Sequence, residues 1–494
     1  MARGRPAPNI ILGPVLYFRG EQGDRWWLSA LFVLEGEAEP YDLRVDGVTL
    51  PVPPRHLAQW RNRHVWRFDF AIPRGSRDVE AAYGFTDGAS PGDIWAVTVP
   101  GRASSPRIAY VSCNGAEDEE KIAGLTAPRN ALWGDLRRRH ESERFHLLLQ
   151  GGDQLYADAV WRQPPLLSAW KKRTDAARLQ EPFTPAMAEE ATDFYFDLYL
   201  RVWGQPETAA VTARIPSVMM WDDHDIFDGW GSHPDEEMMS PAWRGVFTVA
   251  RRHFSLFQLG ATGEAQPECV WGAPLNSFSQ GFRLGDVGVL ALDMRSDRTP
   301  RRVLSDRVWD ALPEWLERFK GCRHLILMSS VPLLYLDTGV MERAVGLSPV
   351  RVGIEDDLRD QWRSPAHAEE WLRLLGLLAE FSRRTGCRVT SVSGEIHAGA
   401  RAVLRGGGVE MWQLIASGVV HPPPAKATTV ALEWLAGRKE TLPNGYVFEM
   451  PAFPESGKRI IRQRNWLSLI FDGKGQIHAR WSAEGQPNRY TQVI

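Results

Sequence analysis

The sequence predicts an α/β protein in two parts, a β-sandwich over residues 1–103 and a layered α/β domain over residues 104–494. With 494 residues, the chain is longer than one ordinary hydrophobic core, which favours two domains. The first hundred residues show the alternation typical of strands, whereas short apolar strands alternate with helical segments beyond residue 107. A stretch with Pro, Gly and Ser at 100–106 marks the predicted boundary.

The N-terminal part has the signature of half-buried strands. Over 66–72 the large side chains Trp, Phe, Phe and Ile alternate with Arg, Asp and Ala, so that one face of the strand is apolar. Residues 26–34 and 93–99 have a similar composition, and turn-forming Gly, Pro, Asp and Asn separate these segments. We therefore expect a small sandwich of the immunoglobulin or fibronectin type.

The larger part alternates short apolar runs with amphipathic segments, as layered α/β folds do, and such folds bind ligands at the carboxyl ends of their strands. The predicted strands cover 108–112, 145–150, 218–220, 288–293, 324–329, 389–393 and 411–416. The predicted helices cover 132–143, 194–203, 243–259 and 371–383. A hairpin of 466–471 and 476–481 is predicted near the C-terminus.

Charge and composition exclude several classes of protein. The formal net charge of −3 gives no general attraction to nucleic acid or to anionic lipid, so no nucleic-acid partner is expected. No run of about 18 apolar residues predicts a membrane span, and no signal peptide is visible at the N-terminus, so we expect a cytoplasmic protein. The four cysteines are widely spaced, which argues against a disulfide framework.

Three polar clusters each follow an apolar run, and they are the most informative feature of the chain. They are Gly152–Asp153–Gln154–Leu155–Tyr156, Trp221–Asp222–Asp223–His224–Asp225 and Gly394–Glu395–Ile396–His397. Oxygen and nitrogen ligands packed this densely are costly to hold without a cation, because like charges repel at close range and must be desolvated. The sequence therefore predicts one metal site built from three strand ends, and a metal-dependent hydrolase.

The first two clusters differ in how specific they are. Asp153 after two glycines lets the backbone come close to a cation, and Tyr156 can return to the same site as a hard ligand; a turn with an Asx hydrogen bond is the equally good alternative. Asp222, Asp223 and His224 are harder to explain without a metal. The best alternative for them is a helix N-cap with acidic residues in the first turn.

The third cluster and two further segments add candidate residues. Glu395 and His397 occupy alternate positions, so both side chains point the same way in an extended segment. Cys113 ends the first strand of the α/β part and is a candidate thiolate ligand, although a buried cysteine is normally a small hydrophobe. Arg295 follows another strand, where it could match phosphate oxygens or bridge a nearby aspartate.

With these motifs, the chain resembles the alkaline phosphatase D family of calcineurin-like metallophosphoesterases. The resemblance rests on Ser-Cys at Cys113, Gly-Asp-Gln-Leu-Tyr-Ala-Asp at 152–158, Trp-Asp-Asp-His-Asp at 221–225, Leu-Asp-x-Arg at 292–295 and Ser-Gly-x-x-His at 393–397. It covers essentially the whole chain. It implies a layered α/β/β/α sandwich behind a leading β domain, with a two-metal centre of ferric iron and calcium.

The resemblance also implies a role for each residue. Cys113, Asp153, Tyr156 and His397 would hold the iron, and Asp153 would bridge to a second metal on the side of Asp222, Asp223 and Glu395. His224 would donate a proton, oriented by Asp225, and Arg295 would neutralise phosphoryl oxygens. A metal-bound hydroxide would attack the phosphorus of a small-molecule monoester or diester.

Two features depart from the pattern of the family. Glu395 stands where the family usually has Asp, so that Zn²⁺ or Mn²⁺ is an alternative at the second site, and the export signal with twin arginines is missing. Two other functions stay open on sequence alone. They are a two-metal hydrolase of carboxylic esters or lactones, and a non-catalytic binding protein stabilised by a metal. The sequence leaves the oligomeric state open, and the loops 161–178 and 229–240 are expected to set the substrate.

Overall fold

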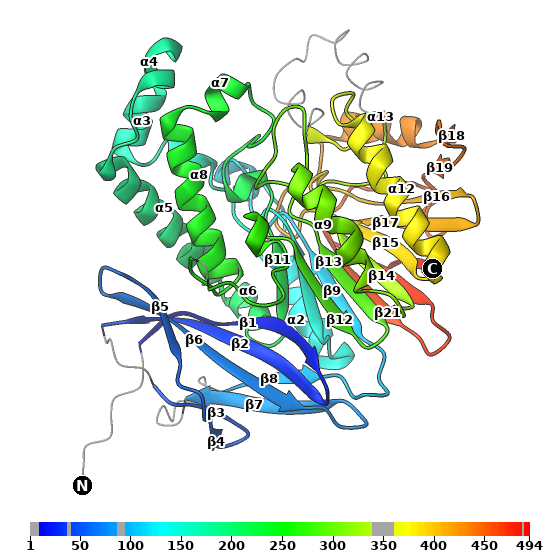
Figure 1. The fold of residues 1–494 in the computed structure, drawn as a ribbon, viewed down its shortest axis with the longest axis horizontal. Helices are drawn as coiled ribbons and strands as arrows, with labels where there is room; N and C mark the ends of the chain where they lie inside the picture. Colours follow the sequence, from blue (N-terminus) through cyan, green and yellow to red (C-terminus); the bar gives the residue numbers. More distant parts are fainter. Residues whose placement is uncertain (1–8, 37–40, 86–93, 264, 338–359, 487–488) are drawn as a thin grey trace.

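The structure is a computed structural model that describes residues 9–36, 41–85, 94–263, 265–337, 360–486 and 489–494. Two large sheets form its centre, and helices lie on both sides of them (Figure 1). The first sheet has ten strands in the spatial order β23 (Tyr490–Val493), β22 (Ile477–Ala483), β21 (Asn465–Phe471), β9 (Arg107–Val111), β10 (Leu147–Gly151), β11 (Ser217–Met220), β1 (Ile10–Gln22), β2 (Arg25–Glu35), β6 (Arg63–Pro73) and β5 (Arg55–Trp60).

The second sheet has nine strands. Its order is β12 (Gln280–Leu284), β13 (Val287–Ala291), β14 (His324–Met328), β15 (Arg388–Ser393), β17 (Val409–Ile415), β16 (Gly399–Gly406), β19 (Val447–Glu449) and β18 (Glu440–Thr441), and β20 (Ile460–Ile461) pairs with β16. Parallel pairing joins β9, β10 and β11 in the first sheet, and β13, β14, β15 and β17 in the second. The carboxyl ends of these strands are therefore the edges at which the loops of each sheet can meet.

The alternation of side chains along these strands builds two kinds of core. In β10, Leu147 and Leu149 belong to the same buried cluster as Ile326 and Met328 of β14, which fills the space between the sheets. Leu148 points to the opposite face, where it joins a second cluster. Parallel strands buried on both faces need apolar residues at every position, which explains why β10 reads as a continuous apolar run.

Helices cover the outer face of each sheet. On the first sheet, α2 (Ala131–Glu143) and α6 (Pro206–Thr212) supply Trp133, Leu136 and Val211 to the cluster of Leu148. On the second sheet, α9 (Asp306–Glu317), α12 (Ala368–Thr385) and α13 (Lys426–Ala436) pack on residues such as Leu325. The layers therefore follow the order α/β/β/α, as predicted.

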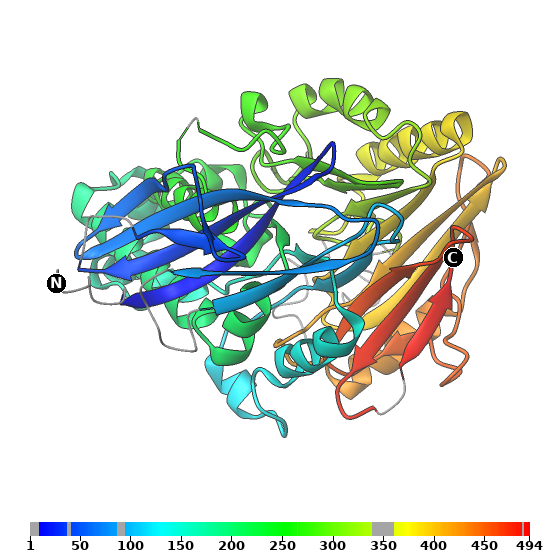
Figure 2. The same cartoon turned by 90° about the horizontal axis from the view of Figure 1, so that it is seen from below.

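The N-terminal strands form a sandwich. The third sheet, β4 (Val48–Thr49), β3 (Leu43–Val45), β7 (Val79–Phe85) and β8 (Ile94–Val99), faces β1, β2 and β6. Phe32 and Phe85 meet across this interface with ring centroids 4.7 Å apart. The sandwich is continuous with the first large sheet, because β1 pairs with β11 through Tyr17 and Ser217. Figure 2 shows these blue strands at the end of the molecule opposite the red C-terminal strands. The division at residue 103 stays a prediction.

A helical insertion lies between β10 and β12. Besides α6 it holds α3 (Pro165–Lys171), α4 (Asp175–Gln180), α5 (Pro185–Trp203), α7 (Asp235–Met238) and α8 (Pro241–His253), which gather on one side of the sheets in Figure 1. The helix predicted over 243–259 is α8 followed by a π-helical turn, Phe254–Gln258. The short helix α1 (Glu119–Ala123) follows β9. Among the described residues, no helix is both long and apolar enough to cross a membrane.

Shortening a side chain in the core between the two sheets should lower the stability of the protein. Leu149 is fully buried, and its replacement by alanine removes contacts that the rigid sheets cannot close. We expect Leu149→Ala to destabilise the protein by about 2–5 kcal/mol, seen as a lower midpoint of thermal unfolding. Val48→Ala, at a 69% exposed position, is the control and should leave the midpoint almost unchanged. Equal midpoints for the two variants would contradict this description of the core.

Candidate metal centre

The carboxyl ends of the parallel strands deliver the predicted residues to one place. In the first sheet, Cys113 follows β9, Asp153 follows β10, and Asp222 and Asp223 follow β11. In the second sheet, Arg295 follows β13, and Glu395 and His397 follow β15. A small cavity of about 30 Å³ lies between these loops, and it is lined by Glu117, Asp153, Asp223, His224, Gly229, Asp360, Glu395 and His397. Its volume suits a water molecule or an ion.

Four of the site residues have a left-handed backbone, which is unusual for residues other than glycine. The φ angles are 56° at Cys113, 53° at Asp153, 66° at Glu395 and 53° at His397. Such conformations are costly for a residue with a Cβ atom, and they persist where the surrounding structure fixes them, often at functional sites.

The glycine before Asp153 is required by the close packing of the loops. Gly152 has a φ angle of 104°, and a Cβ atom there would lie 2.8 Å from the Cβ atom of Asp222. Only glycine combines this backbone angle with this approach. The Gly-Gly pair of the first motif therefore serves to bring Asp153 against Asp222 and Asp223.

Asp153, Asp222 and Asp223, here named the carboxylate cluster, offer oxygen atoms within 4.8 Å of one another. Burial raises the pKa of Asp153 well above its usual range, and the neighbouring carboxylates add to the rise. Burial also raises the pKa of Asp222 to about 6, although Arg295 opposes this. Asp153 Oδ1 is buried without a hydrogen-bond partner among the described residues. Three crowded carboxylates with an unpaired oxygen fit a metal ion.

Cys113 and Tyr156, two of the predicted iron ligands, lie next to Asp153. Cys113 Sγ is 3.5 Å and Tyr156 Oη is 3.3 Å from Asp153 Oδ2. Ser417, after β17, places its Oγ atom 3.1 Å from the sulfur. Burial, with the nearby Asp153 carboxylate, raises the pKa of the Cys113 thiol. A cation at this point would reverse the preference for the protonated thiol, because thiolate is the form that binds metals.

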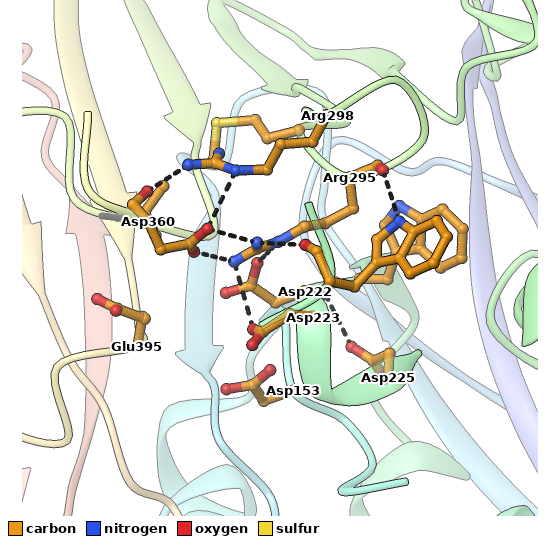
Figure 3. A network of polar contacts seen from close by, with 12 residues as sticks. Asp153, Asp222, Asp223, Asp225, Arg295, Arg298, Asp360 and Glu395 are labelled. Carbon is orange, nitrogen blue, oxygen red and sulfur yellow. Dashed lines mark hydrogen bonds and ion pairs between the residues drawn. The ribbon is translucent and has the colours of Figure 1, made fainter. Parts of the chain in front are cut away.

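His397 and Glu395 line the same cavity, but neither belongs to the carboxylate cluster. His397 lies with Glu117 and His421, and the rings of the two histidines stack at 3.4 Å between centroids. Glu395 receives hydrogen bonds of 2.7 Å on both carboxylate oxygens from Gln361 Nε2. In Figure 3 the carboxylate of Glu395 lies apart from the carboxylate cluster. The structure thus brings Cys113, Asp153, Tyr156, Asp222 and Asp223 together and leaves Glu395 at the rim.

His224 is oriented by Asp158. Its Nδ1 atom lies 3.0 and 3.1 Å from the two carboxylate oxygens of Asp158, and its ring stacks on Tyr156 at 4.3 Å. Burial acts to lower the pKa of His224, but the carboxylates of Asp158, Asp223 and Asp153 outweigh it and raise this pKa well above 6.5. The metal-free geometry therefore favours the protonated form of this imidazole beside the carboxylate cluster.

Asp225, predicted to orient His224, binds the loops instead. Its carboxylate accepts hydrogen bonds from the backbone N–H of Asp222 at 2.9 Å, that of Leu155 at 3.2 Å and Gln258 Nε2 at 2.8 Å. Burial raises its pKa to about 7, although these hydrogen bonds oppose the rise. The expected partnership of Asp225 with the imidazole is thus replaced by one with Asp158, and Asp225 ties the first motif to the second.

Arg295 is fully buried, and its donors are occupied by protein groups. It donates to Asp222, to Asp223 at 3.3 Å, to the Trp230 carbonyl at 3.0 Å and to both oxygens of Asp360, one of them at 2.8 Å (Figure 3). In this geometry the guanidinium compensates the carboxylates and has no donor directed at the cavity. The expected contact with phosphoryl oxygens therefore needs a different arrangement of Arg295 from the one described here.

Asp360 is the third carboxylate that pairs with Arg295. It lies 3.0 Å from Arg298 Nε and accepts a 2.6 Å hydrogen bond from Ser232. Burial acts to raise the pKa of Asp360, but Arg295 and Arg298 hold it below its usual range. Asp360 therefore stays ionised and fixes the guanidinium that the carboxylate cluster faces.

Four residues of the cavity region were not predicted from the sequence: Glu117, Asp158, Asp360 and His421. Asp158 had a signal, since it lies two residues after Tyr156 in the same motif. His421 follows the strand predicted over 411–416, but at a distance of several residues. Glu117 lies several residues after the strand predicted over 108–112, and Asp360 has no predicted strand close before it. Both lie in charged stretches, so no local pattern separates them from solvated residues.

The raised pKa of Asp225 predicts a pH-dependent difference in stability. Between about pH 4 and 7 the folded protein keeps a proton on Asp225 that the unfolded chain releases, so this group destabilises the folded state as the pH rises. In the presence of a chelator, we compare the midpoints of thermal unfolding of Asp225→Asn and of the wild type. We expect the variant's midpoint, relative to that of the wild type, to be higher at pH 8 than at pH 5. The control Asp235→Asn changes an exposed carboxylate and should give a curve parallel to the wild type. A gain for Asp225→Asn that is the same at both pH values would contradict the raised pKa.

The sequence is similar to those of known proteins. Residues 109–351 match the family model of PhoD related phosphatases. An uncharacterized protein of Saccharomyces cerevisiae, YGR266W, is 25% identical over 473 residues, which cover 79% of this chain and 66% of the relative. The chain thus spans just under two thirds of the length of that relative.

Two solved structures have a similar fold. The structure of PhoD has a TM-score of 0.58 at 13% identity, covering 99% of this chain and 90% of that one. Purple acid phosphatase PPD1 from yellow lupin (Lupinus luteus) seeds has a TM-score of 0.53 at 11% identity, covering 97% of this chain and 73% of that one. The predicted fold class is thereby confirmed. Over residues 109–351 the sequence is similar to the PhoD related phosphatases, the family that the strand-end motifs predicted, and the fold is similar to that of PhoD.

Proposed function

We propose that the chain is a metal-dependent phosphoesterase that hydrolyses small-molecule phosphate esters. The carboxylate cluster carries this proposal, because it places Asp153, Asp222 and Asp223 at one buried point beside a small cavity. The match to PhoD related phosphatases supports the same reaction. A cytoplasmic location stays a prediction from the sequence alone.

The donor set supports two or more metal ions. Cys113 and Tyr156, with the shared carboxylate of Asp153, suit ferric iron, and the oxygens of Asp222 and Asp223 suit calcium, with Zn²⁺ or Mn²⁺ as alternatives. Glu395, held by Gln361 at the rim, could approach the second metal only by turning its carboxylate toward the cluster. Bound metal ions would neutralise phosphoryl oxygens and activate water.

The residues of the chain would then bind, orient and protonate the substrate. His224 would donate a proton from Nε2 to the leaving oxygen, because Asp158 occupies its Nδ1 atom. Asp225 would hold the loops of Asp153 and Asp222 in register. We propose that Arg295 acts mainly by keeping Asp222 and Asp223 in place, since its donors are engaged with them and with Asp360.

The walls of the cavity support a compact reacting group. Gly229, at the start of the loop predicted to set the substrate, lines the cavity, and its N–H donates a 2.8 Å hydrogen bond to Asp223 Oδ2. A Cβ atom at Gly229 would lie 2.7 Å from His233. The loop is therefore packed closely around the site. A comparison of phosphomonoester and phosphodiester substrates would show which class of ester fits within it.

His224 and Asp158 provide the direct test of the proposed proton donor. We expect His224→Ala to lower kcat by about 10²–10⁴-fold, the usual contribution of a general acid. Asp158→Asn should lower kcat by about 10–100-fold, because the imidazole loses its orienting partner but remains in place. The measurement is hydrolysis of p-nitrophenyl phosphate and bis(p-nitrophenyl) phosphate, with metal content determined in parallel.

His478→Ala, on the C-terminal hairpin, is the matched control and should keep full activity. Carboxylic ester and lactone substrates in the same panel test the rival hydrolase reaction. Unchanged phosphoester hydrolysis in His224→Ala, or activity confined to carboxylic esters, would refute the proposed function. Absence of hydrolysis of every substrate would favour the binding protein.

Metal content tests the proposed donor set independently of turnover. For protein purified without chelator, elemental analysis by mass spectrometry should find about one iron and a second divalent metal per chain. Cys113→Ser and Tyr156→Phe should lower the iron content and leave the second metal, because Asp222 and Asp223 are unchanged. Zinc or manganese in place of iron, unaffected by these substitutions, would contradict the iron assignment.

A further inference from the structure

A second cleft, of about 940 Å³, lies between the N-terminal sandwich and the helical insertion. Its walls come from β5, α5, α8 and residues 262–263 and 266–278, and β5 lies next to the ends of α5 and α8 in Figure 1. Among the described residues, none lines both this cleft and the small cavity of the metal centre. Sites for small organic ligands usually measure about 300–1,000 Å³, so the cleft is large enough for one.

Part of the wall is apolar and already in place. Phe196, Leu256 and Phe278 line the cleft and are buried, and Trp60 is half-buried there. The indole of Trp60 is fixed, because its Nε1 atom donates a 2.7 Å hydrogen bond to Asp193. Leu256 belongs to the π-helical turn that follows α8, and such turns are frequent at functional sites. The cleft therefore offers a preformed apolar surface for the body of a ligand.

The charged residues of the lining are all positive. Arg251 and Arg252 line the cleft, and no aspartate or glutamate does so among the described residues. Arg251 donates to Ser296 Oγ at 2.7 Å and to Asn276 Oδ1 at 2.9 Å, and its guanidinium lies 4.2 Å from the centre of the Phe278 ring. Arg252 is exposed and has no hydrogen bond or ion pair with a described residue. Neither guanidinium is thus paired with a carboxylate.

Two carboxylates lie next to lining residues, and both are engaged elsewhere. Asp193 accepts the hydrogen bond from Trp60 and pairs with Arg61. Asp293 accepts hydrogen bonds from the hydroxyl of Ser296 and from the backbone. Neither lines the cleft. The positive charge of the lining is therefore left uncompensated, which favours an anionic ligand.

His253 adds a hydrogen-bond acceptor to the same wall. Its Nδ1 atom lies 2.8 Å from the carbonyl oxygen of Val249, so this nitrogen carries the proton. Burial lowers the pKa of His253 to about 4, and the ring is therefore neutral at physiological pH. Its Nε2 atom then has a lone pair and no hydrogen-bond partner in the part of the chain that the structure describes. Such a nitrogen favours a ligand that carries an N–H or O–H donor.

We propose that this cleft binds an amphipathic organic anion, with an aromatic or branched apolar body and one carboxylate, sulfonate or phosphate group. The apolar body packs on the buried wall, the anionic group meets Arg252, and an N–H or O–H donates to His253 Nε2. The site is separate from the metal centre, and the inference does not rest on the proposed phosphoesterase reaction.

A matched pair of fluorescent probes tests the binding site. The anion 8-anilinonaphthalene-1-sulfonate and the uncharged N-phenyl-1-naphthylamine share their aromatic rings and their N–H, and they differ only in the sulfonate. Full-length protein, as purified, is titrated with each probe. We expect saturable binding of both, tighter binding of the sulfonate, and displacement of the neutral probe by the sulfonate.

Variants of α8 locate the probe. Arg252→Gln should weaken binding of the sulfonate about tenfold and leave the neutral probe unaffected. Thr248→Glu adds a negative charge at an exposed lining position and should have the same selective effect. The matched control Arg244→Gln removes an exposed arginine from the same helix but outside the cleft, and both probes should bind as they do to the wild type.

A variant of the metal centre and the oligomeric state complete the test. Asp223→Asn should bind both probes as the wild type does. Loss of sulfonate binding in this variant, with wild-type binding in Arg252→Gln, would place the probe at the metal centre and overturn the proposal. Absence of saturable binding would overturn it as well. If light scattering then showed a dimer, the cleft would belong to a contact with a second copy of the chain.

Discussion

Arg295 joins the two sheets at the point where their parallel strands end. It follows a strand of the second sheet, and its guanidinium donates to Asp222 and Asp223 of the first sheet and to Asp360. A buried charge is tolerated only when it is paired and its hydrogen bonds are satisfied, and here the protein occupies the donors on all sides. The loops that carry the carboxylates are thereby held at one distance from one another, and the cavity between the sheets keeps its shape.

The charges around Arg295 also explain why the site should attract cations. Arg295 and Arg298 face Asp360, Asp222 and Asp223, and Asp153 adds a further carboxylate with an unpaired oxygen. The negative groups outnumber the positive ones in a place that water hardly reaches, so protonation or a metal ion must compensate the excess. In the metal-free protein, burial raises the pKa of Asp153 and of Asp222, and the neighbouring carboxylates add to the rise.

The sequence predicted the layers, the parallel strands and the convergence of Asp153, Asp222 and Asp223, because an apolar run followed by a polar cluster marks a strand end. It could not predict that β1 would pair with β11, since that pairing depends on the sandwich docking at the sheet edge. Nor did it choose Asp158 over Asp225 as the partner of His224. Adjacent residues in a turn point in different directions, and only the folded loops decide which carboxylate meets the ring.

The left-handed backbone at Cys113, Asp153, Glu395 and His397 lowers the stability of the fold at the positions that carry candidate ligands. Glycine would adopt these angles without strain, so replacing any of the four would relax the loop while deleting a candidate ligand. A chain selected for stability alone would therefore lose its site at the strand ends first, and the fold would remain intact. Programmes that raise the thermal stability of this protein by consensus or by screening should hold these four positions fixed.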